Sequence, residues 1–536
     1  MTRALAVALA ATLSAGAFAA QPTDRAQAAD PPLPEFTYVG VVADAAELGD
    51  PEVKEVIFPT IFHAGAHLAN PLGEWYMYYA PHNSPGGVFL KYADSLDGPW
   101  TKWSGGRVIT NQWAGIYDVS HVSSPDAIWN PADNKMYMFF HGENHIERFA
   151  TTTDGINFTY GGTAVETSMI SSTSREVSYG RVFAHPNPSL GNKWAMFFME
   201  NTTEGIRRIR QAVSNNLRDW TIRTDFVMRP TALDGTDISA GNLVNFGGQN
   251  YIAYHGSNGK IMARTIDPSL TTVGAPAILY DVNRGARFTP RVAAPEFTTN
   301  AGYTYLHYEV GDRLAAKIAF AKLSLADPAR LSCAGAGSDE FSGYTFNASK
   351  WPAIVRPTLA RHTVGGDSLR IPTYGTGVAG APLIQQPVKS GAWQVTTAVN
   401  IAPKAAYQQA GLLLWASDST YAKLDVGHGS RGKTLEFIQR KSGSDRNVWL
   451  TDSIPAPATL GERVWLRLTS NGTQMTASYS VNGSSFVAFG QPVLLTSVPA
   501  TKIGPFALRG ATSAQEIAGV FDWFQWKPTA AELAAC

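Results

Sequence analysis

An aromatic-rich segment recurs five times along this chain and limits its possible folds more than any other feature. The copies read GEWYMYYAPH, NKMYMFFHGEN, NKWAMFFMEN, GQNYIAYHGS and GYTYLHYEVG. Their aligned positions, Tyr76, Tyr137, Ala195, Tyr251 and Tyr305, are 54 to 61 residues apart. A single unit cannot bury its apolar face alone, so this period indicates a repeat architecture. Strand-rich units of this size are typical of propeller blades. The sequence therefore predicts a five-bladed β-propeller with its functional site in a narrow central funnel.

The period ends near Leu325, and a second kind of pattern follows. ADPARLSCAGAGSDEF is predicted to be a linker, and region 336–528 contains alternating segments such as WQVTTAVNI, AGLLLWA and VWLRLTSNG. Alternation of this kind, at this spacing, predicts the strands of a β-sandwich. The predicted fold class is thus all-β: a propeller over 35–328, then a jelly-roll or concanavalin-like sandwich over 336–528. The sandwich is expected to pack on the propeller or to bind glycan.

The first residues are predicted to be a targeting segment. Arg3 precedes an apolar run, and Ala17-Phe18-Ala19 offers a cleavage site, so residues 1–20 are interpreted as a signal peptide and 21–34 as a linker. A secreted, extracellular protein is expected. Lys plus Arg and Asp plus Glu are 43 each, so no nucleic-acid partner is expected. No mature segment approaches the length of a membrane span, and a monomer is expected.

The chain has two cysteines, Cys333 and Cys536. In an oxidising compartment they could form one bridge that ties the start of the second domain to its end, which we favour over two unpaired thiols. Neither cysteine has a neighbouring histidine or basic cluster, so neither is expected to be catalytic.

Several segments resemble a known family. YYAPHNSPGGVFLKYADSLDGPW and SSPDAIW…KMYMFF resemble the blades of glycoside hydrolase family 43, and DEFSGYTFNASKW and VFDWFQW resemble the sandwich appended to many of its members. The resemblance covers nearly all of the mature chain. It implies a carbohydrate-active enzyme with a polysaccharide or oligosaccharide substrate. It also implies three funnel carboxylates, since hydrolysis uses a pair of carboxyl groups across the sugar.

The positions that match those carboxylates hold other residues. Phe58 takes the blade-one position, Arg181 the blade-three position, and the blade-four position falls near Ser239-Ala240-Gly241. Only Asp126 keeps an acid at a matching inner-strand site. The expected triad is therefore absent from this alignment.

Histidine, tyrosine and arginine are predicted to occupy the funnel instead. Such a set suits β-elimination of a uronide, in which arginine neutralises the substrate carboxylate and His or Tyr moves the protons. The residue types also resemble propeller enzymes that act on the rhamnose–glucuronate linkage of plant gums. The predicted catalytic residues are His63, His82, His121, Tyr179 and Arg181. The predicted substrate-binding residues are His67, Asp126, His141, His255 and Arg291.

Structural interpretations of these residues stay open. His63 and His67 could lie at a strand edge, and their predicted strand and turn do not imply a helical zinc pair. His141 and His255 occupy equivalent repeat positions, which is also typical of structural repetition. Arg181 could pair with Glu176 or Asp126, and the neighbours of Arg291 that could replace it are Arg284 and Arg287. The acids that could restore a hydrolase are Glu176, Glu296 and Asp237.

Three functions follow from these observations. The first is a lyase that cleaves a uronic-acid linkage, such as rhamnose–glucuronate, by elimination. The second is a hydrolase of the family 43 type with a rearranged site, and the third is a non-catalytic glycan-binding propeller. No cofactor and no metal ligand are predicted. A divalent cation such as calcium on the propeller axis is compatible with histidines facing a channel, but no ligand spacing requires one.

Overall fold

The computed structural model describes residues 33–281, 291–300, 302–323, 327–342, 345–365, 367–429, 432–441, 453–455 and 460–536. The proposed signal peptide, most of the 21–34 linker, and Arg284 and Arg287 lie outside these residues. The described chain is almost entirely β-structure, with two short α-helices, α1 (Ala64–His67) and α2 (Ala530–Ala535). None of the helices in the described part is long and apolar enough to cross a membrane.

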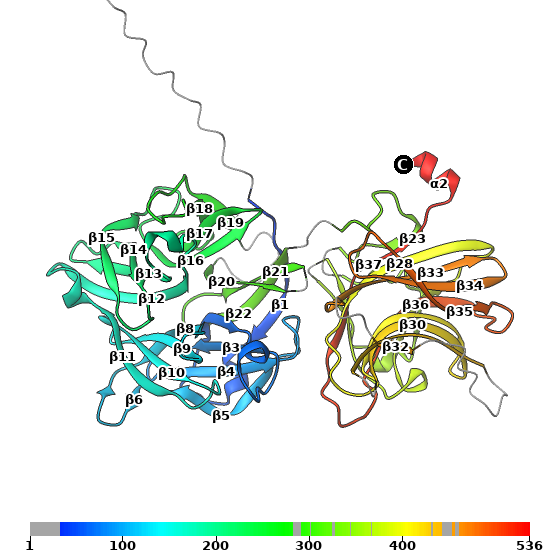
Figure 1. Ribbon diagram of the computed structural model, residues 1–536, viewed down its shortest axis with the longest axis horizontal. Coiled ribbons are helices and arrows are strands. Elements are labelled where there is room, and N and C mark those ends of the chain that lie inside the picture. The colour runs from blue at the N-terminus through cyan, green and yellow to red at the C-terminus, as the bar shows by residue number, and fades with distance from the viewer. Residues whose placement is uncertain are drawn as a thin grey trace, which may run out of the picture. The chain divides into compact units, whose positions relative to one another are not determined.

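Five four-stranded antiparallel sheets account for the first part of the described chain (Figure 1). The first contains β2 (Ile57–Phe62), β3 (Trp75–Ala80), β4 (Val88–Ala93) and β5 (Thr101–Ile109). The second contains β8 (Val122–Asn130), β9 (Lys135–Gly142), β10 (Ile146–Thr152) and β11 (Thr159–Glu166). The third contains β12 (Ser174–Ala184), β13 (Trp194–Thr202), β14 (Arg207–Ser214) and β15 (Thr221–Met228). The fourth contains β16 (Ile238–Phe246), β17 (Gln249–Gly256), β18 (Ile261–Thr265) and β19 (Ala277–Tyr280). A small hairpin of β6 (Gln112–Trp113) and β7 (Tyr117–Asp118) lies between the first two sheets in sequence.

The fifth sheet joins the two ends of this part of the chain. It contains β20 (Val292–Asn300), β21 (Tyr303–Val310), β22 (Lys317–Leu323) and, as its outer strand, β1 (Thr37–Ala43). β1 pairs antiparallel with β22, with Thr37 opposite Lys322. The innermost strands contact one another in the order β2, β8, β12, β16, β20 and back to β2, which closes the ring of a propeller.

The aromatic repeats form the second strand of each sheet, as predicted. The aligned repeat positions are buried between neighbouring sheets. Four of them are fully buried (Tyr76, Tyr137, Ala195 and Tyr305), and Tyr251 is 3% exposed. Burial of these large rings is the main stabilising contribution that the repeats make, because apolar area removed from water scales with ring size. The aromatic strands are therefore scaffold, and they position the inner strands.

Each inner strand carries a β-bulge at the same place. In β2, Phe58 and Pro59 together oppose one residue of β3, and β8, β12, β16 and β20 repeat this pattern. The first bulge residue has a positive φ in all five sheets: Phe58 (52°), Ser124 (54°), Tyr179 (60°), Ala240 (53°) and Ala294 (46°). Positive φ is uncommon for residues other than glycine, and strained positions of this kind are frequent at functional sites.

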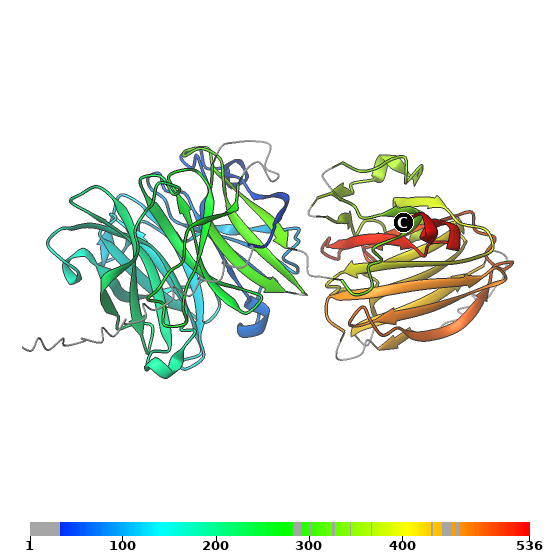
Figure 2. The same cartoon turned by 90° about the horizontal axis from the view of Figure 1, so that it is seen from above.

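The second part of the chain forms two further sheets (Figures 1 and 2). One contains β25 (Thr363–Val364), β26 (Leu369–Pro372), β37 (Ala518–Trp526), β28 (Ala392–Asn400), β33 (Arg463–Asn471), β34 (Gln474–Ser480) and β35 (Val487–Leu494), with β23 (Gly335–Asp339) paired to β37. The other contains β24 (Ala353–Val355), β27 (Leu383–Pro387), β36 (Lys502–Leu508), β29 (Gln409–Ser417), β30 (Thr420–Gly429), β31 (Gly432–Arg440) and β32 (Ser453–Pro455). One apolar core that includes Leu412, Phe437 and Phe521 lies between them, which is the sandwich that the alternating pattern predicts.

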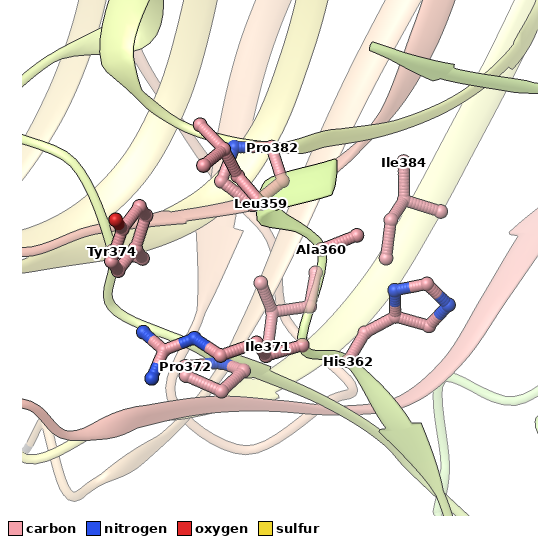
Figure 3. A pocket seen from close by; sticks show the side chains of 9 residues that line it. Leu359, Ala360, His362, Ile371, Pro372, Tyr374, Pro382 and Ile384 are labelled. Atoms are coloured by element: carbon pink, nitrogen blue, oxygen red, sulfur yellow. The ribbon is translucent and has the colours of Figure 1, made fainter. Parts of the chain in front are cut away.

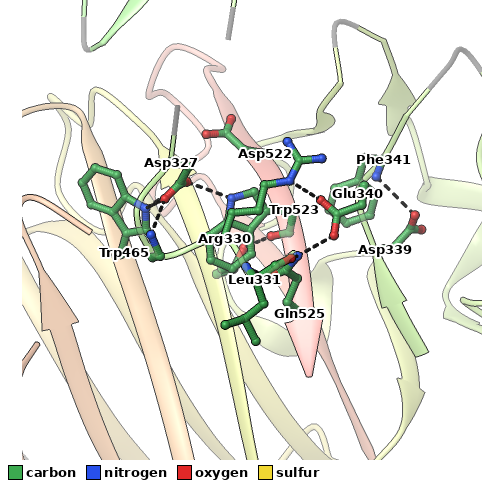
Figure 4. A network of polar contacts seen from close by, with 12 residues as sticks. Asp327, Arg330, Leu331, Asp339, Glu340, Phe341, Trp465, Asp522, Trp523 and Gln525 are labelled. Carbon is green, nitrogen blue, oxygen red and sulfur yellow. Dashed lines mark hydrogen bonds and ion pairs between the residues drawn. The ribbon is translucent and has the colours of Figure 1, made fainter. Parts of the chain in front are cut away.

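The segment that opens the second part is anchored by a polar network (Figure 4). The Asp327 carboxylate accepts hydrogen bonds from the indole N–H groups of Trp465 (2.9 Å) and Trp523 (2.8 Å). Arg330 pairs with Glu340 at 2.6 Å. The predicted bridge between Cys333 and Cys536 is present, with Cα atoms 6.1 Å apart. The start and the end of this part are thus held together both covalently and by buried polar contacts.

Candidate functional site

A ring of polar side chains lies directly after the five bulges. The equivalent residues are Thr60, Asp126, Arg181, Asn242 and Glu296. Arg181 donates to Asp126 (3.0 Å) and pairs with Glu296 (3.3 Å). The Asn242 side-chain amide donates to Glu296 at 2.8 Å. The ring is a connected hydrogen-bond network on the propeller axis, and its members are buried or half-buried.

Arg181 is a structural member of this ring. Its side chain is 1% exposed, its Nη2 donates to the Pro59 carbonyl at 2.8 Å, and its guanidinium lies 4.0 Å from the Phe58 ring centroid. Of the two acidic partners that the sequence left open for Arg181, the structure shows Asp126. Glu176 pairs with Arg207 instead. Neither Arg181 nor Asp126 lines the cavity described below, so the predicted catalytic role of Arg181 and the predicted substrate-binding role of Asp126 have no support from their positions.

Two carboxyl groups share the single guanidinium of Arg181. Burial raises the pKa of Asp126, while the Arg181 charge opposes that rise. Burial likewise raises the pKa of Glu296 to about 7, with Arg181 lowering it and Asp126 raising it further. Like charges in one buried site disfavour double ionisation. The ring therefore favours a state in which one of the two carboxyls keeps its proton.

A cavity of about 260 Å³ lies beside this ring, at the inner strands β2, β12, β16 and β20. The residues that line it come from four sheets and from the turns that follow their strands. They are Ile57, Phe58, Tyr179, Arg207, Asp237, Ser239, His255, Gly256, Ser257, Gly259, Arg291, Glu309 and Arg313. Among the predicted site residues, Tyr179, His255 and Arg291 are brought together here.

Two bulge residues supply the aromatic wall of the cavity. Phe58 and Tyr179 stack with their ring centroids 5.4 Å apart. The strand register shows that Tyr179, not Arg181, is the equivalent of Phe58 in the third sheet. The sequence alignment was thus wrong by two residues there, because it matched the first bulge residue of β2 to the residue that comes directly after the bulge of β12. Ala240 is the equivalent in the fourth sheet, as the alignment indicated. All three positions lack an acid.

Three arginines project charge into the cavity, and each has an acidic partner. Arg207 pairs with Glu176 at 3.3 Å, and its backbone N–H donates to Asp237 at 2.8 Å. Arg291 pairs with Glu309 at 2.7 Å. Arg313 pairs with the buried Glu55 at 2.9 Å. The wall therefore holds three guanidinium groups and the carboxylates of Asp237 and Glu309, which suits hydrogen bonding to several sugar hydroxyls more than binding of one strong anion.

The two acidic residues that line the cavity, Asp237 and Glu309, differ in their exposure to solvent. Glu309 is 2% exposed, and its Oε1 accepts the Phe58 backbone N–H at 3.2 Å. Asp237 is half-buried, and its Oδ2 accepts the Thr236 hydroxyl at 2.9 Å. Asp237 is thus the more accessible carboxylate of the pair.

His255 lies at the cavity as a neutral donor. Its Nδ1 accepts the Ala294 backbone N–H at 3.3 Å, so the neutral ring carries its proton on Nε2. Burial lowers the pKa of His255 well below its usual value, and the nearby Arg291 lowers it further. The ring is suited to donate one hydrogen bond and not to act as a cation.

Three other predicted histidines gather in a second cluster. His82 follows β3, His121 precedes β8, and His141 lies in β9. One ring nitrogen of each lies within 4.8 Å of the others. His141 also meets Tyr179 edge-on at 5.4 Å between ring centroids, which places the cluster beside the cavity wall. Within the described part of the chain, these three histidines are the group whose side chains are close enough together to hold a metal ion.

His63 and His67 lie elsewhere. The predicted strand and turn is instead the short helix α1, with His63 just before it and His67 at its end. His63 stacks on Trp75 and its Nε2 lies 2.7 Å from Glu74; this hydrogen bond lowers the pKa of Glu74 to about 2. His67 stacks on Trp129 at 4.8 Å. These contacts favour the structural interpretation of both histidines.

Sequence reasoning missed Arg207, Arg313 and Glu309. Glu309 carried a usable signal, because it occupies the fifth-repeat position that is equivalent to His141 and His255. Arg207 and Arg313 lie at a strand start and in a turn, where the repeat alignment gives no equivalent to compare.

The sandwich offers a smaller hollow (Figure 3). Leu359, His362, Ile371 and Tyr374 are among its lining residues, and its volume is about 10 Å³. This volume is about that of one water molecule, so the hollow does not accommodate a sugar.

Comparison with known proteins gives one family match. Residues 382–527 match the family model described as the Beta xylosidase C-terminal Concanavalin A-like domain. No significant match is found among curated proteins. Solved structures with a similar arrangement include a mutant of the GH43 protein BlXynB from Bacillus licheniformis (13% identity, TM-score 0.37, covering 90% of this chain and 99% of that one). Xylan beta-1,4-xylosidase from Bacillus halodurans has 15% identity and a TM-score of 0.36, with 89% and 99% covered.

Identities and TM-scores at this level do not support transfer of an activity. The match over 382–527 and the sheets themselves carry the conclusion. The chain is an all-β protein whose C-terminal part is similar to the concanavalin A-like domain of beta xylosidases.

Proposed function

We propose that the protein is a carbohydrate-active enzyme that hydrolyses a glycosidic bond, with a sugar of the substrate bound in the 260 Å³ cavity. The observation that carries this proposal is the composition of the cavity wall. An aromatic face from Phe58 and Tyr179 shares the cavity wall with two carboxylates and three guanidinium groups. Such a wall can contact the apolar face of a sugar ring and its hydroxyl groups at the same time.

Hydrolysis needs two carboxyl groups at the scissile bond. We assign proton transfer to Asp237, because it is the accessible carboxylate of the cavity. We assign Glu309 to stabilisation of the positive charge that develops on the sugar, because both its oxygens already accept hydrogen bonds, from Phe58 N–H and Arg291. These two acids replace the ones that are missing at the bulge positions.

The C-terminal part supports a carbohydrate substrate. Its similarity is to a domain named for beta xylosidases, and the substrate of this chain is proposed on that basis to be a polysaccharide or oligosaccharide. The particular sugar is left to the substrate panel below.

Elimination fits the cavity less well. Burial raises the pKa of Tyr179, which makes its hydroxyl a poorer base at neutral pH. Arg181, the cation predicted to bind a uronate carboxylate, is held in the buried ring. The guanidinium groups that line the cavity belong to Arg207, Arg291 and Arg313, and all three face acidic partners.

A substrate panel separates the possibilities. The protein is incubated with xylan, arabinan and gum arabic, and both new reducing ends and the ultraviolet absorbance of an unsaturated uronide are followed. Reducing ends without the absorbance band are expected. Asp237→Asn should lower kcat/KM by about 10²- to 10⁴-fold. Asp225, which is exposed in β15 and does not line the cavity, provides the matched control, Asp225→Asn.

Three results would overturn the proposal. Growth of the absorbance band would establish elimination instead. Activity that survives unchanged in both Asp237→Asn and Glu309→Gln would remove the cavity from the reaction. Glycan binding without any new ends would leave the non-catalytic binder.

A further inference from the structure

The histidine cluster beside the cavity has no role in the proposed hydrolysis. Its members come from two neighbouring sheets: His82 lies two residues beyond β3, His121 one residue before β8, and His141 inside β9. Their ring centroids are 4.7 to 5.7 Å apart. The fold thus brings three imidazoles together from separate turns and strands.

The nitrogens of this cluster are buried without partners. Nε2 of His82, Nε2 of His121 and both ring nitrogens of His141 have no hydrogen-bond partner among the described residues. His141 is fully buried and His121 is 8% exposed. A buried polar atom left unsatisfied is costly, and several such atoms aimed at one place need an explanation.

We propose that His82, His121 and His141 form a binding site for a divalent transition-metal ion, with zinc(II) as the favoured ion. The site holds three neutral nitrogen ligands and leaves at least one coordination position open. This inference does not depend on the proposed hydrolase function.

The spacing of the ligands fits such an ion. The candidate nitrogens lie within 4.8 Å of one another. Ligand nitrogens of a tetrahedral zinc ion are roughly 3.4 Å apart, given Zn–N bonds of about 2.0–2.1 Å. Small rotations of the His82 ring reduce this difference, because His82 is half-buried and lies in a turn.

The donor set selects the class of metal. Imidazole suits zinc, copper and nickel, whereas calcium and magnesium prefer oxygen ligands. The cluster contains imidazoles and no carboxylate. The calcium ion considered from the sequence is therefore not the ion that this cluster favours.

The orientation of the rings agrees with this role. The Ser120 hydroxyl lies 2.9 Å from Nδ1 of His121. This hydrogen bond restrains the His121 ring through Nδ1, as outer partners of metal-bound histidines do, and leaves the buried Nε2 to bind the ion.

The experiment uses the untagged full chain after treatment with a chelator. Zinc chloride alone is titrated by calorimetry, and cobalt(II) is added separately to record the visible bands of a nitrogen-ligated ion. One zinc per chain is expected, with a higher melting temperature after loading. His82→Asn should weaken zinc binding at least about 100-fold, and Ser120→Ala about 10-fold. His145→Asn, an exposed histidine in the neighbouring turn, should bind as the wild type does.

His82 is the first variant because its half-buried position in a turn leaves the sheet core intact. Circular dichroism and the melting curve of metal-free protein check that the variant is folded. Failure of the wild-type chain to bind zinc would overturn the proposal. Equal zinc affinity in folded His82→Asn, or preference for calcium over zinc, would overturn it as well. Neither result bears on the substrate panel, so the two proposals fail separately.

Discussion

Phe58 and Tyr179 stack across the propeller axis with their ring planes 23° apart, although they belong to the first and the third sheet. Both are the positive-φ residue of an inner-strand bulge. Phe58 also lies under the Arg181 guanidinium. This aromatic pair therefore joins the cavity wall to the buried polar ring, and changes to it should affect both substrate binding and stability.

Phe58→Ala should lower the free energy of unfolding by about 3–5 kcal/mol, because it removes a buried ring from a packed site. Thermal and denaturant unfolding measure the effect. Phe158→Ala, which shortens a half-buried ring in the second sheet, should cost clearly less. An equal decrease in the free energy of unfolding in the two variants would contradict a larger packing contribution from Phe58.

Arg181→Met should be severely destabilising, by about 3–5 kcal/mol, because it leaves two buried carboxyls without the cation that they share. Differential scanning calorimetry would record the loss. Arg175→Met, at an exposed position in the same strand, serves as the control and should change little. A stable Arg181→Met variant with lost activity alone would restore the substrate-binding role that the sequence suggested.

Glu296→Gln should change stability in a pH-dependent way. The pKa of Glu296 is raised from 4.5 to about 7, so between these values the folded state keeps a proton that the unfolded state loses. Wild-type stability therefore falls as pH rises through this window, by at most about 3 kcal/mol from this group. The variant lacks this fall. Between pH 4.5 and 7 the free energy of unfolding of Glu296→Gln should therefore rise relative to that of the wild type, and above pH 7 the difference should stay constant. Denaturant titrations at several pH values, with exposed Glu52→Gln as control, test this; a constant difference would contradict it.

Arg207→Lys should raise KM about 10-fold or more, because lysine keeps the charge but loses the planar fork that can bind two oxygens. Steady-state kinetics on the active substrate measure the change. The next residue gives a matched control: Arg208 pairs with Glu204 and does not line the cavity, so Arg208→Lys should leave KM unchanged. A similar rise in KM in both variants would mean that the change acts through the strand and not through the cavity.

Cys333→Ser should lower the stability of the C-terminal part by at most about 5 kcal/mol, because the bridge closes a loop whose ends are 203 residues apart. For the wild type, melting curves with and without reductant compare the chain without and with the bridge. The Asp327 network and the α2 capping box remain in the variant, so the part should still fold. An unchanged melting temperature would mean that these contacts alone hold the ends.

The repeat pattern was sufficient to predict the sheets but not the shape of their inner strands. Aromatic residues recur because each sheet must bury the same face, so their period is visible in the sequence. The bulges are not visible, because their first residues belong to four different types: Phe58, Ser124, Tyr179, Ala240 and Ala294. Positive φ at these positions is imposed by the surrounding sheets. The alignment error at Arg181 has this cause.

The candidate site was predictable in part for a similar reason. Tyr179 lies in an inner strand, Arg291 lies just before one and His255 lies near the end of an aromatic strand, and all three were found by these positions. His82, His121 and His141 were each predicted, but their meeting point depends on how two sheets pack. Arg207 and Arg313 belong to a strand start and a turn, whose direction is set by tertiary contacts and not by local pattern.

The pairing of β1 with β22 has a consequence for synthesis of the chain. β1 leaves the ribosome early, and its partner, the third strand of the last sheet, follows some 280 residues later. Until then β1 has no neighbour, and the four earlier sheets form an open arc with exposed edges, which can pair with other chains. Closing a loop of this length is slow compared with local strand pairing. The protein thus stays vulnerable to aggregation until its propeller is nearly fully translated, and removal of 37–43 would make that vulnerability permanent.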